Sequence, residues 1–243
     1  MTDLSSRLNQ EERERRFPNV RPRDAATLIV IDRSGPAHKV LMGRRHDGHK
    51  FMPGKFVFPG GRVEPYDSRM PAAGEMPPAT VTRLLDKSGR MSPTRARAIA
   101  LAAIRETCEE TGLLIGRRAD AAPSVPDPAW QPFAKGGVVP DLETVHFIAR
   151  AITPPGRPRR FDTRFFAADA SGIIERTDGV IGPDSELTEL VWVPLVDARA
   201  LDLPAITHMV LDDLDIRVRD GFGRELPVPF YRQERGRFVR TLL

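Results

Sequence analysis

Short runs of apolar, β-branched and aromatic residues alternate along the chain with one long helix-forming segment. Such runs, bounded by glycine, proline and aspartate, are typical of strands, and they fall at 25–32, 39–44, 55–58, 144–151, 164–168 and 189–194. The alanine-, arginine- and glutamate-rich segment 94–111 favours helix, and shorter helical patterns fall at 196–201 and 206–214. Elements mixed in this order predict an α/β or α+β sandwich with a mixed sheet.

The end of the long helix carries an acidic cluster. Glu106, Glu109 and Glu110 stand at i, i+3 and i+4 and therefore share one helix face, where they repel one another. Carboxylate oxygens are the ligands that Mg²⁺ and Mn²⁺ prefer. A solvated acidic face is the alternative, and the cluster alone leaves both interpretations open.

A glycine turn upstream favours the metal site. Pro59, Gly60 and Gly61 follow the apolar run 55–58, and paired glycines let the backbone turn and approach a ligand closely. Ser92 and Pro93 provide a favoured N-cap and first helical residue, and the glycine at 112 favours a helix end. A strand, a glycine turn and an acidic helix together are far more specific than any one of them.

These residues resemble the Nudix hydrolase family, whose signature is G-x5-E-x7-R-E-U-x-E-E-x-G-U with an aliphatic residue at U. Gly61 matches the first glycine, and the second half is matched by Arg105, Glu106, Glu109, Glu110, Gly112 and Leu113. Asp67 stands where the family has Glu, and Thr107 replaces an aliphatic residue. About 30 additional residues separate the two halves, a lengthening that a loop accommodates at modest entropic cost.

The insertion, 68–93, reads as a loop with one short helical turn near 80–85. An interrupted box of this kind resembles the Nudix branch that includes the peroxisomal coenzyme A diphosphatases, and the segment 41–61 is also similar to that branch. The C-terminal residues Thr241, Leu242 and Leu243 are not a Ser-Lys-Leu address, so the organelle is not carried over.

The resemblance implies an α/β/α sandwich that hydrolyses, with Mg²⁺ or Mn²⁺, the diphosphate of a nucleoside diphosphate linked to another moiety. Coenzyme A or an acyl derivative is the first substrate expected, and NADH or ADP-ribose-type dinucleotides are the second. A catalytically silent, nucleotide-binding Nudix domain is the rival. The implied metal ligands are Glu106, Glu109, Glu110 and the Gly60 carbonyl. Arg105 would orient a glutamate, and a glutamate or Asp67 would be the general base.

Further candidates lie outside the box. Arginine suits phosphate binding and an aromatic ring can stack on a base, although a charged hairpin with an ordinary core explains the same residues equally well. The substrate-binding candidates are Arg44, Arg159, Arg160, Phe161 and Arg164. Because Nudix enzymes often bring another carboxylate from a later loop, Glu186 is the first choice for it and Glu189 the second.

Composition sets the remaining bounds. With 243 residues, 40% of them hydrophobic, the chain can form one sizeable core, and we expect a charged N-terminal arm, 1–23, followed by a single domain, 24–243. No apolar run approaches the roughly 18–20 residues of a membrane span. The arm lacks the apolar core of a signal peptide, which predicts a cytoplasmic protein.

The charge and the cysteine content limit which ligands and partners the protein can bind. A single cysteine, Cys108, excludes an intrachain disulfide and a cysteine zinc cluster. The net charge of +4 fits a polyanionic small substrate, and without a zinc-finger spacing or an RNP-like motif nucleic acid is an unlikely partner. The stretch 227–232 packs either on a second copy in a homodimer or on its own domain.

Overall fold

The computed structural model describes residues 17–48, 53–223 and 226–243. Its strands are β1 (Arg23–Asp32), β2 (Lys39–Arg45), β3 (Phe56–Val57), β4 (Gly60–Arg62), β5 (Leu113–Ile115), β6 (Arg117–Arg118), β7 (Val138–Val139), β8 (His146–Ile152), β9 (Phe161–Asp169), β10 (Ile173–Arg176), β11 (Leu187–Pro194), β12 (Pro229–Glu234) and β13 (Arg237–Leu242). The described α-helices are α2 (Pro78–Leu85), α3 (Pro93–Thr111), α4 (Gln131–Gly136) and α5 (Ala205–Arg219).

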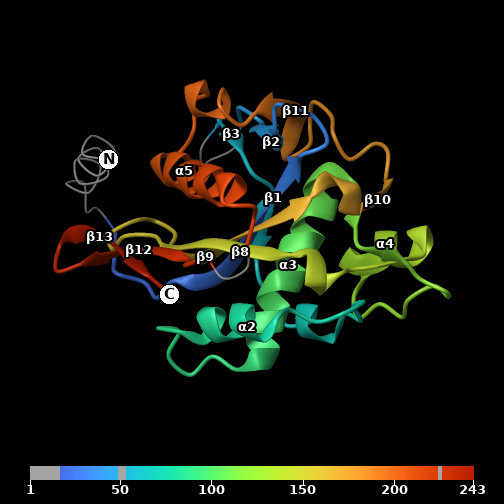
Figure 1. Ribbon diagram of the computed structural model, residues 1–243, viewed down its shortest axis with the longest axis horizontal. Coiled ribbons are helices and arrows are strands. Elements are labelled where there is room, and N and C mark those ends of the chain that lie inside the picture. The colour runs from blue at the N-terminus through green and yellow to red at the C-terminus, as the bar shows by residue number, and fades with distance from the viewer. Residues whose placement is uncertain (1–16, 49–52, 224–225) are drawn as a thin grey trace.

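A mixed sheet forms the centre of the molecule (Figure 1). Among the described residues it has nine strands in the order β11-β2-β1-β9-β8-β12-β13, with β3 paired to β2 and β4 to β1. β1 runs parallel to β9 and β12 parallel to β8, whereas the other pairs are antiparallel. The prediction of a mixed sheet is confirmed.

Helices cover both faces of the sheet. Because successive side chains of a strand point to opposite faces, each central strand can contribute to a core on either side. Leu28 and Val30 of β1 join the core beneath α3, whereas Ile29 and Ile31 join the core beneath α5. Figure 1 shows α5 on one side of the sheet and α2 and α3 on the other. This arrangement is the α/β/α sandwich expected from the sequence. No helix in the described part of the chain has both the length and the apolar character to cross a membrane.

Most predicted elements are present, with one clear error. The helix predicted at 94–111 is α3, and the one predicted at 206–214 is the longer α5. The prediction of a helix at 196–201 is wrong, because only a single 3₁₀ turn forms there, Ala198–Ala200. Val196 is 71% exposed and Pro204 follows closely, so this segment has neither the apolar face nor the length that a packed helix needs.

The insertion is an ordered part of the domain. It contains α2, longer than the single turn predicted, and its Met70, Met76 and Leu84 are buried in the core beneath α3. Arg150 in β8 holds the C-terminal part of the insertion. Its guanidinium donates to the carbonyl oxygens of Asp86 and Lys87 and to the Ser88 hydroxyl. The inserted residues therefore form a wall of the molecule beside α3.

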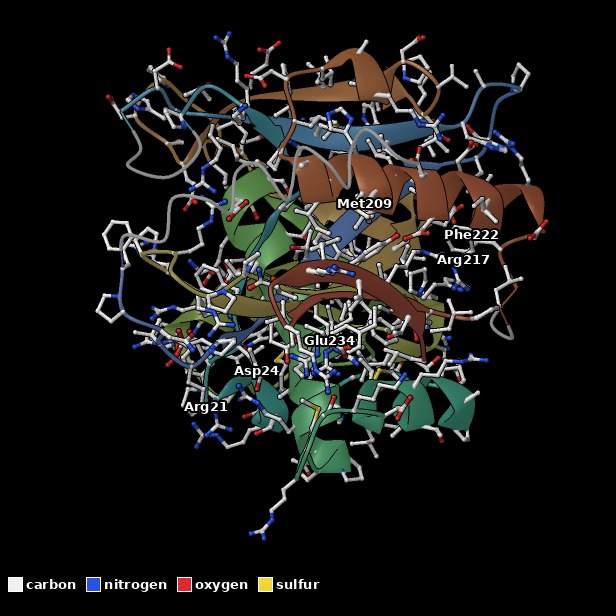
Figure 2. The ribbon with its side chains drawn as sticks, turned by 90° about the vertical axis from the view of Figure 1, so that its left-hand side faces the viewer. Arg21, Asp24, Met209, Arg217, Phe222 and Glu234 are labelled. Carbon is white, nitrogen blue, oxygen red and sulfur yellow. The ribbon has the colours of Figure 1, made fainter. Side chains whose placement is uncertain are left out.

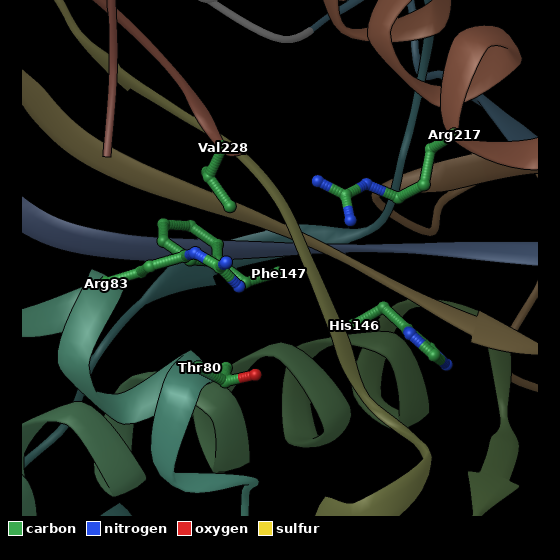
Figure 3. A pocket seen from close by; sticks show the side chains of 6 residues that line it. All are labelled: Thr80, Arg83, His146, Phe147, Arg217 and Val228. Carbon is green, nitrogen blue, oxygen red and sulfur yellow. The ribbon is translucent and has the colours of Figure 1, made fainter. Parts of the chain in front are cut away.

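The C-terminal strands complete the sheet. β12 lies between β8 and β13, so the part of the stretch 227–232 in this strand packs within its own domain. Near the start of β12, a small cavity lies between α2, β8 and α5. Its volume of about 10 Å³ is the size of one water molecule. Figure 3 shows its lining: Thr80, Arg83, His146, Phe147, Arg217 and Val228.

Candidate active site

The helix α3 positions the acidic cluster, and its ends form as the sequence predicts. The Ser92 hydroxyl accepts a hydrogen bond from the Arg95 amide, which caps the N-terminus. Gly112 ends the helix with a left-handed φ of 77°. A Cβ at Gly112 would lie 2.2 Å from the carbonyl oxygen of Thr177, so only glycine fits there.

Arg105 is the centre of the site. Its side chain is 2% exposed, and its Nη1 donates to Glu106 Oε1 at 2.9 Å and to Glu109 Oε2 at 2.7 Å. Nη2 donates to the carbonyl oxygen of Arg62, the last residue of β4, at 2.8 Å. One guanidinium therefore ties the acidic helix face to this strand through charge-assisted hydrogen bonds.

Asp67 lies behind Arg105, across the insertion. It is fully buried, and its carboxylate accepts from Nε and Nη2 of Arg105 at 2.8 and 3.2 Å. The Glu64 amide donates to the same carboxylate at 2.8 Å. Although Asp67 and Arg105 are 38 residues apart, the structure brings them into direct contact.

Glu106 lies directly against the glycine turn. A Cβ at Gly61 would fall 2.4 Å from the carboxyl carbon of Glu106, far inside van der Waals contact, so the second glycine makes room for this carboxylate. Burial raises the pKa of Glu106 to about 7, with Arg105 opposing the rise and Glu109 adding to it.

Glu110 is the most deeply buried of the three glutamates, at 8% exposed. Burial, and then the charges of Glu186 and Glu106, raise its pKa well above the ordinary value, while Arg45 and the Gly60 amide oppose the rise. Burial also raises the pKa of Glu109, against the effect of Arg105. All three carboxyl groups therefore hold their protons more tightly than exposed glutamates do.

The structure separates the two candidates for an extra carboxylate. Glu186 interacts electrostatically with Glu110 and accepts a hydrogen bond from Arg45 Nη2 at 2.7 Å. Glu189 is exposed on β11, opposite Arg44 of β2. Glu186 therefore joins the acidic cluster, and Arg45 is a neighbour that the sequence analysis had not singled out.

The acidic cluster suits a divalent cation. The three glutamates repel one another unless positive charge lies among them, and carboxylate oxygens are the hard ligands that Mg²⁺ and Mn²⁺ prefer. In the described part of the chain, no group of three or more His, Cys, Asp or Glu side chains is already arranged to hold a metal ion. Instead, Glu106 and Glu109 turn toward the guanidinium of Arg105.

The substrate-binding candidates divide into two groups. Arg44 and Arg159 are exposed, whereas Arg160 holds the N-terminal segment by donating to Asn19 Oδ1 and to the carbonyl oxygens of Val20 and Thr153. Phe161 begins β9 beside Arg23 of β1. Arg164 is fully buried, with Nη1 donating to Asp24 Oδ1 at 2.7 Å. Asp24 is 140 residues away, so the sequence offered no signal for this pair, and Asp162 in the same strand is a second acidic partner, with its Oδ2 3.2 Å from Nη1.

Three solved structures similar to this chain are Nudix proteins. The Nudix hydrolase of Alicyclobacillus acidocaldarius is 30% identical, covers 79% of this chain and 90% of its own, and superposes with a TM-score of 0.57. The Nudix domain of Shewanella oneidensis NrtR complexed with ADP-ribose is 12% identical, with coverage of 82% and 90% and a TM-score of 0.46. The MutT protein of Methanosarcina mazei is 15% identical, with coverage of 82% and 97% and a TM-score of 0.45. No family model matches the chain.

The chain belongs to the Nudix hydrolase family, as its identity and coverage with the Alicyclobacillus enzyme show. It is accordingly an enzyme that hydrolyses phosphorus-containing anhydrides, the diphosphate bonds of nucleoside diphosphate derivatives. Divalent metal ions generally serve such hydrolases, in agreement with the chemistry of the acidic cluster.

Proposed function

We propose that this protein is a diphosphatase whose Mg²⁺ or Mn²⁺ is held by Glu106, Glu109, Glu110 and the carbonyl oxygen of Gly60. The observation that carries the proposal is the cluster of three glutamates with raised pKa values beside the glycine turn, of which Glu110 is buried. A bound cation neutralises the charge of a diphosphate and makes water easier to deprotonate. Glu186 would assist Glu110, with which it interacts electrostatically, whereas Glu189, on β11 opposite Arg44, would not.

The chain's own residues would orient the reacting groups. Arg105 fixes Glu106 and Glu109 through Nη1, and Asp67 fixes Arg105 in turn. Because the Asp67 carboxylate is fully buried and already accepts three hydrogen bonds, we assign it a positioning role. The general base is then one of the glutamates, which lie nearer to solvent and can take a proton from water.

Coenzyme A or an acyl-coenzyme A is the substrate we propose first. The support is the box interrupted by the ordered insertion, which resembles the branch that acts on coenzyme A. The exposed Arg44 and Arg159 are candidate contacts for its phosphates. NADH and ADP-ribose-type dinucleotides are the alternative within the same chemistry.

A substrate panel tests the proposal. The wild-type protein is incubated with coenzyme A, acetyl-coenzyme A, ADP-ribose and NADH, each with Mg²⁺, with Mn²⁺ and with EDTA, and the released mononucleotide is measured. We expect metal-dependent turnover, highest for the coenzyme A substrates. Higher kcat/KM for the dinucleotides would replace the substrate assignment while leaving the metal-dependent mechanism in place. Nucleotide binding without turnover of any diphosphate would contradict catalysis and favour the silent, nucleotide-binding Nudix domain.

A further inference from the structure

A second charged region lies beside the N-terminal end of α3. A groove of about 770 Å³ opens there, within the usual size range of small-molecule sites. Its walls come from the start of β1, the loop after the glycine turn, β9 and the end of the insertion. We call it the arginine groove after six of its lining residues, Arg21, Arg23, Arg62, Arg90, Arg95 and Arg164. Figure 2 labels Arg21 and Asp24 on this side of the molecule.

The buried arginine of the groove is Arg164. Its Nη1 donates to Asp24 Oδ1 at 2.7 Å and to the Asp162 carbonyl oxygen at 2.8 Å. Its Nε has no hydrogen-bond partner among the described residues, although the atom is buried. A buried guanidinium that leaves a donor unsatisfied carries a desolvation cost that an anionic partner relieves.

The arginine groove carries more positive than negative charge. Its acidic lining residues are Asp24, Glu64 and Asp162, half as many as its arginines. Each of the three already pairs with a lining arginine: Asp24 with Arg95 and Arg164, Asp162 with Arg164, and Glu64 with Arg62. The exposed Arg21, Arg23 and Arg90 make no ion pair within the described ranges. These three guanidiniums are therefore available to an anion.

The N-terminal end of α3 adds to the excess of positive charge in the groove. The N-terminus of α3 carries the positive end of the helix dipole, which favours nearby anions. Its first turns instead carry Arg95 and Arg97 and no acidic residue. These arginines add positive charge at the helix end that is already positive. Together with the unsatisfied Nε of the buried Arg164, they make this region suited to a bound anion.

The arginine groove also adjoins the active site through one short segment. Arg62 and Glu64 line the groove, while the Arg62 carbonyl accepts from Arg105 and the Glu64 amide donates to Asp67. Along α3, Arg95 and Glu106 are about 16 Å apart at 1.5 Å per residue. An anion in the groove would thus contact the loop that holds the catalytic arginine without reaching the glutamates.

We propose that the arginine groove is an anion site for a phosphate-bearing ligand, separate from the carboxylates that hold the metal. The insertion builds part of it, since Ser88, Arg90 and Met91 line the groove. The ligand is either the distal phosphate of a substrate whose diphosphate lies at the glutamates or a separate phosphorylated effector. Both present the same chemistry to the guanidiniums.

Binding of inorganic tripolyphosphate tests the proposal in EDTA, where the metal-free glutamates repel the probe. Calorimetry compares the wild type with the double variant Arg21→Ala/Arg90→Ala, both exposed positions without ion pairs among the described residues. The charge-matched control is Arg176→Ala/Arg237→Ala, two exposed arginines outside the groove lining. We expect the groove variant to weaken binding at least about tenfold and the control to change it less than about twofold. Circular dichroism confirms that all three proteins are folded.

Unchanged binding in the groove variant, equal weakening in the control, or no binding by the wild type would each overturn the proposal. These outcomes do not depend on turnover, so they are distinguishable from failure of the proposed diphosphatase function. Kinetics then identify the source of the phosphate. A raised KM at constant kcat in the groove variant indicates a distal substrate phosphate. A tripolyphosphate effect on wild-type kcat that is absent from the variant indicates an effector.

Discussion

The two ends of α3 carry opposite unbalanced charges. At the C-terminal end, Glu106, Glu109 and Glu110 have raised pKa values despite the adjacent Arg105. At the N-terminal end the effect is reversed for Asp24: burial would raise its pKa, but Arg164 and Arg95 outweigh burial and lower it. Burial is therefore the main cause of the raised values, whereas at Asp24 the attraction of two arginines outweighs burial.

Both clusters also oppose the helix dipole. Negative charge is unfavourable at a helix C-terminus and positive charge at an N-terminus, and α3 has no basic residue in its last turn and no acidic residue in its first. Burial of its alanines against the sheet holds the helix in place regardless of these charges. This difference between the ends underlies the proposed cation at one and the proposed anion at the other, and it can be tested by changing single charges at each end.

Neutralising Glu110 should have the largest effect. Glu110→Gln removes a ligand and a charge that the proposed cation requires, so we expect kcat to fall at least about 100-fold with the best substrate. The free energy of unfolding without metal should rise by on the order of 1 kcal/mol, because the amide removes repulsion from Glu186 and Glu106. Steady-state kinetics and urea denaturation measure the two effects.

The matched control for this variant is Glu189→Gln, which changes the exposed carboxylate on β11. We expect its kcat to stay within about twofold of the wild type, since surface substitutions away from a site have small effects. Equal losses in both variants would contradict the choice of Glu186 and Glu110 over Glu189. Full activity of Glu110→Gln would remove Glu110 from the metal site.

Neutralising Asp67 should have a smaller effect on kcat and a larger effect on stability. Asp67→Asn replaces one of the three carboxylate partners of the buried Arg105 with a neutral amide, which should lower the free energy of unfolding by about 2 kcal/mol. We expect kcat to fall about tenfold as Arg105 loses its fixed orientation. If kcat instead fell as far as in Glu110→Gln, with little change in stability, Asp67 would be the general base.

Adding a methyl group at Gly61 should move one carboxylate without removing charge. Because the Cβ would lie 2.4 Å from the carboxyl carbon of Glu106, Gly61→Ala should displace that side chain and destabilise the protein by about 1–3 kcal/mol. We expect kcat to fall severalfold. Gly35→Ala is the control, since no atom lies within 4 Å of its added Cβ, and wild-type activity is expected there. Unchanged kcat in Gly61→Ala would show that the position of Glu106 is not critical.

The local features of the sequence predicted the fold well. α3 was predicted to within one residue, because Ser92, Pro93 and Gly112 give its ends by local chemistry. The central strands followed from their apolar, β-branched runs. The error at 196–201 arose because a short propensity pattern does not show whether an apolar face has anything to pack against. The pairing of β12 between β8 and β13 is equally a tertiary property.

The candidate site was predictable in its residue types but not in its pairings. The glutamates and Arg105 are adjacent along one helix, so helical periodicity alone brings them together. The contacts of Asp67 with Arg105 and of Asp24 with Arg164 join positions 38 and 140 residues apart. Arginine composition could indicate phosphate chemistry, but only the fold distinguishes Arg160, which holds a backbone segment, from the arginines that line the groove.

The smallest expected effect concerns Asp24 and pH. Its folded-state pKa lies below the ordinary value of 3.8, so ionised Asp24 contributes stability that is fully present above about pH 5 and is lost as the pH falls through the folded pKa. Asp24→Asn lacks this contribution. The difference in free energy of unfolding between wild type and variant should be about 1 kcal/mol at pH 7 and should shrink below pH 4. Asp120→Asn, at an exposed position without an ion pair among the described residues, should show no difference at either pH. A difference for Asp24→Asn that grew toward low pH would mean that the surplus of positive charge does not act on this carboxylate, and the contrast between the two ends of α3 would fail.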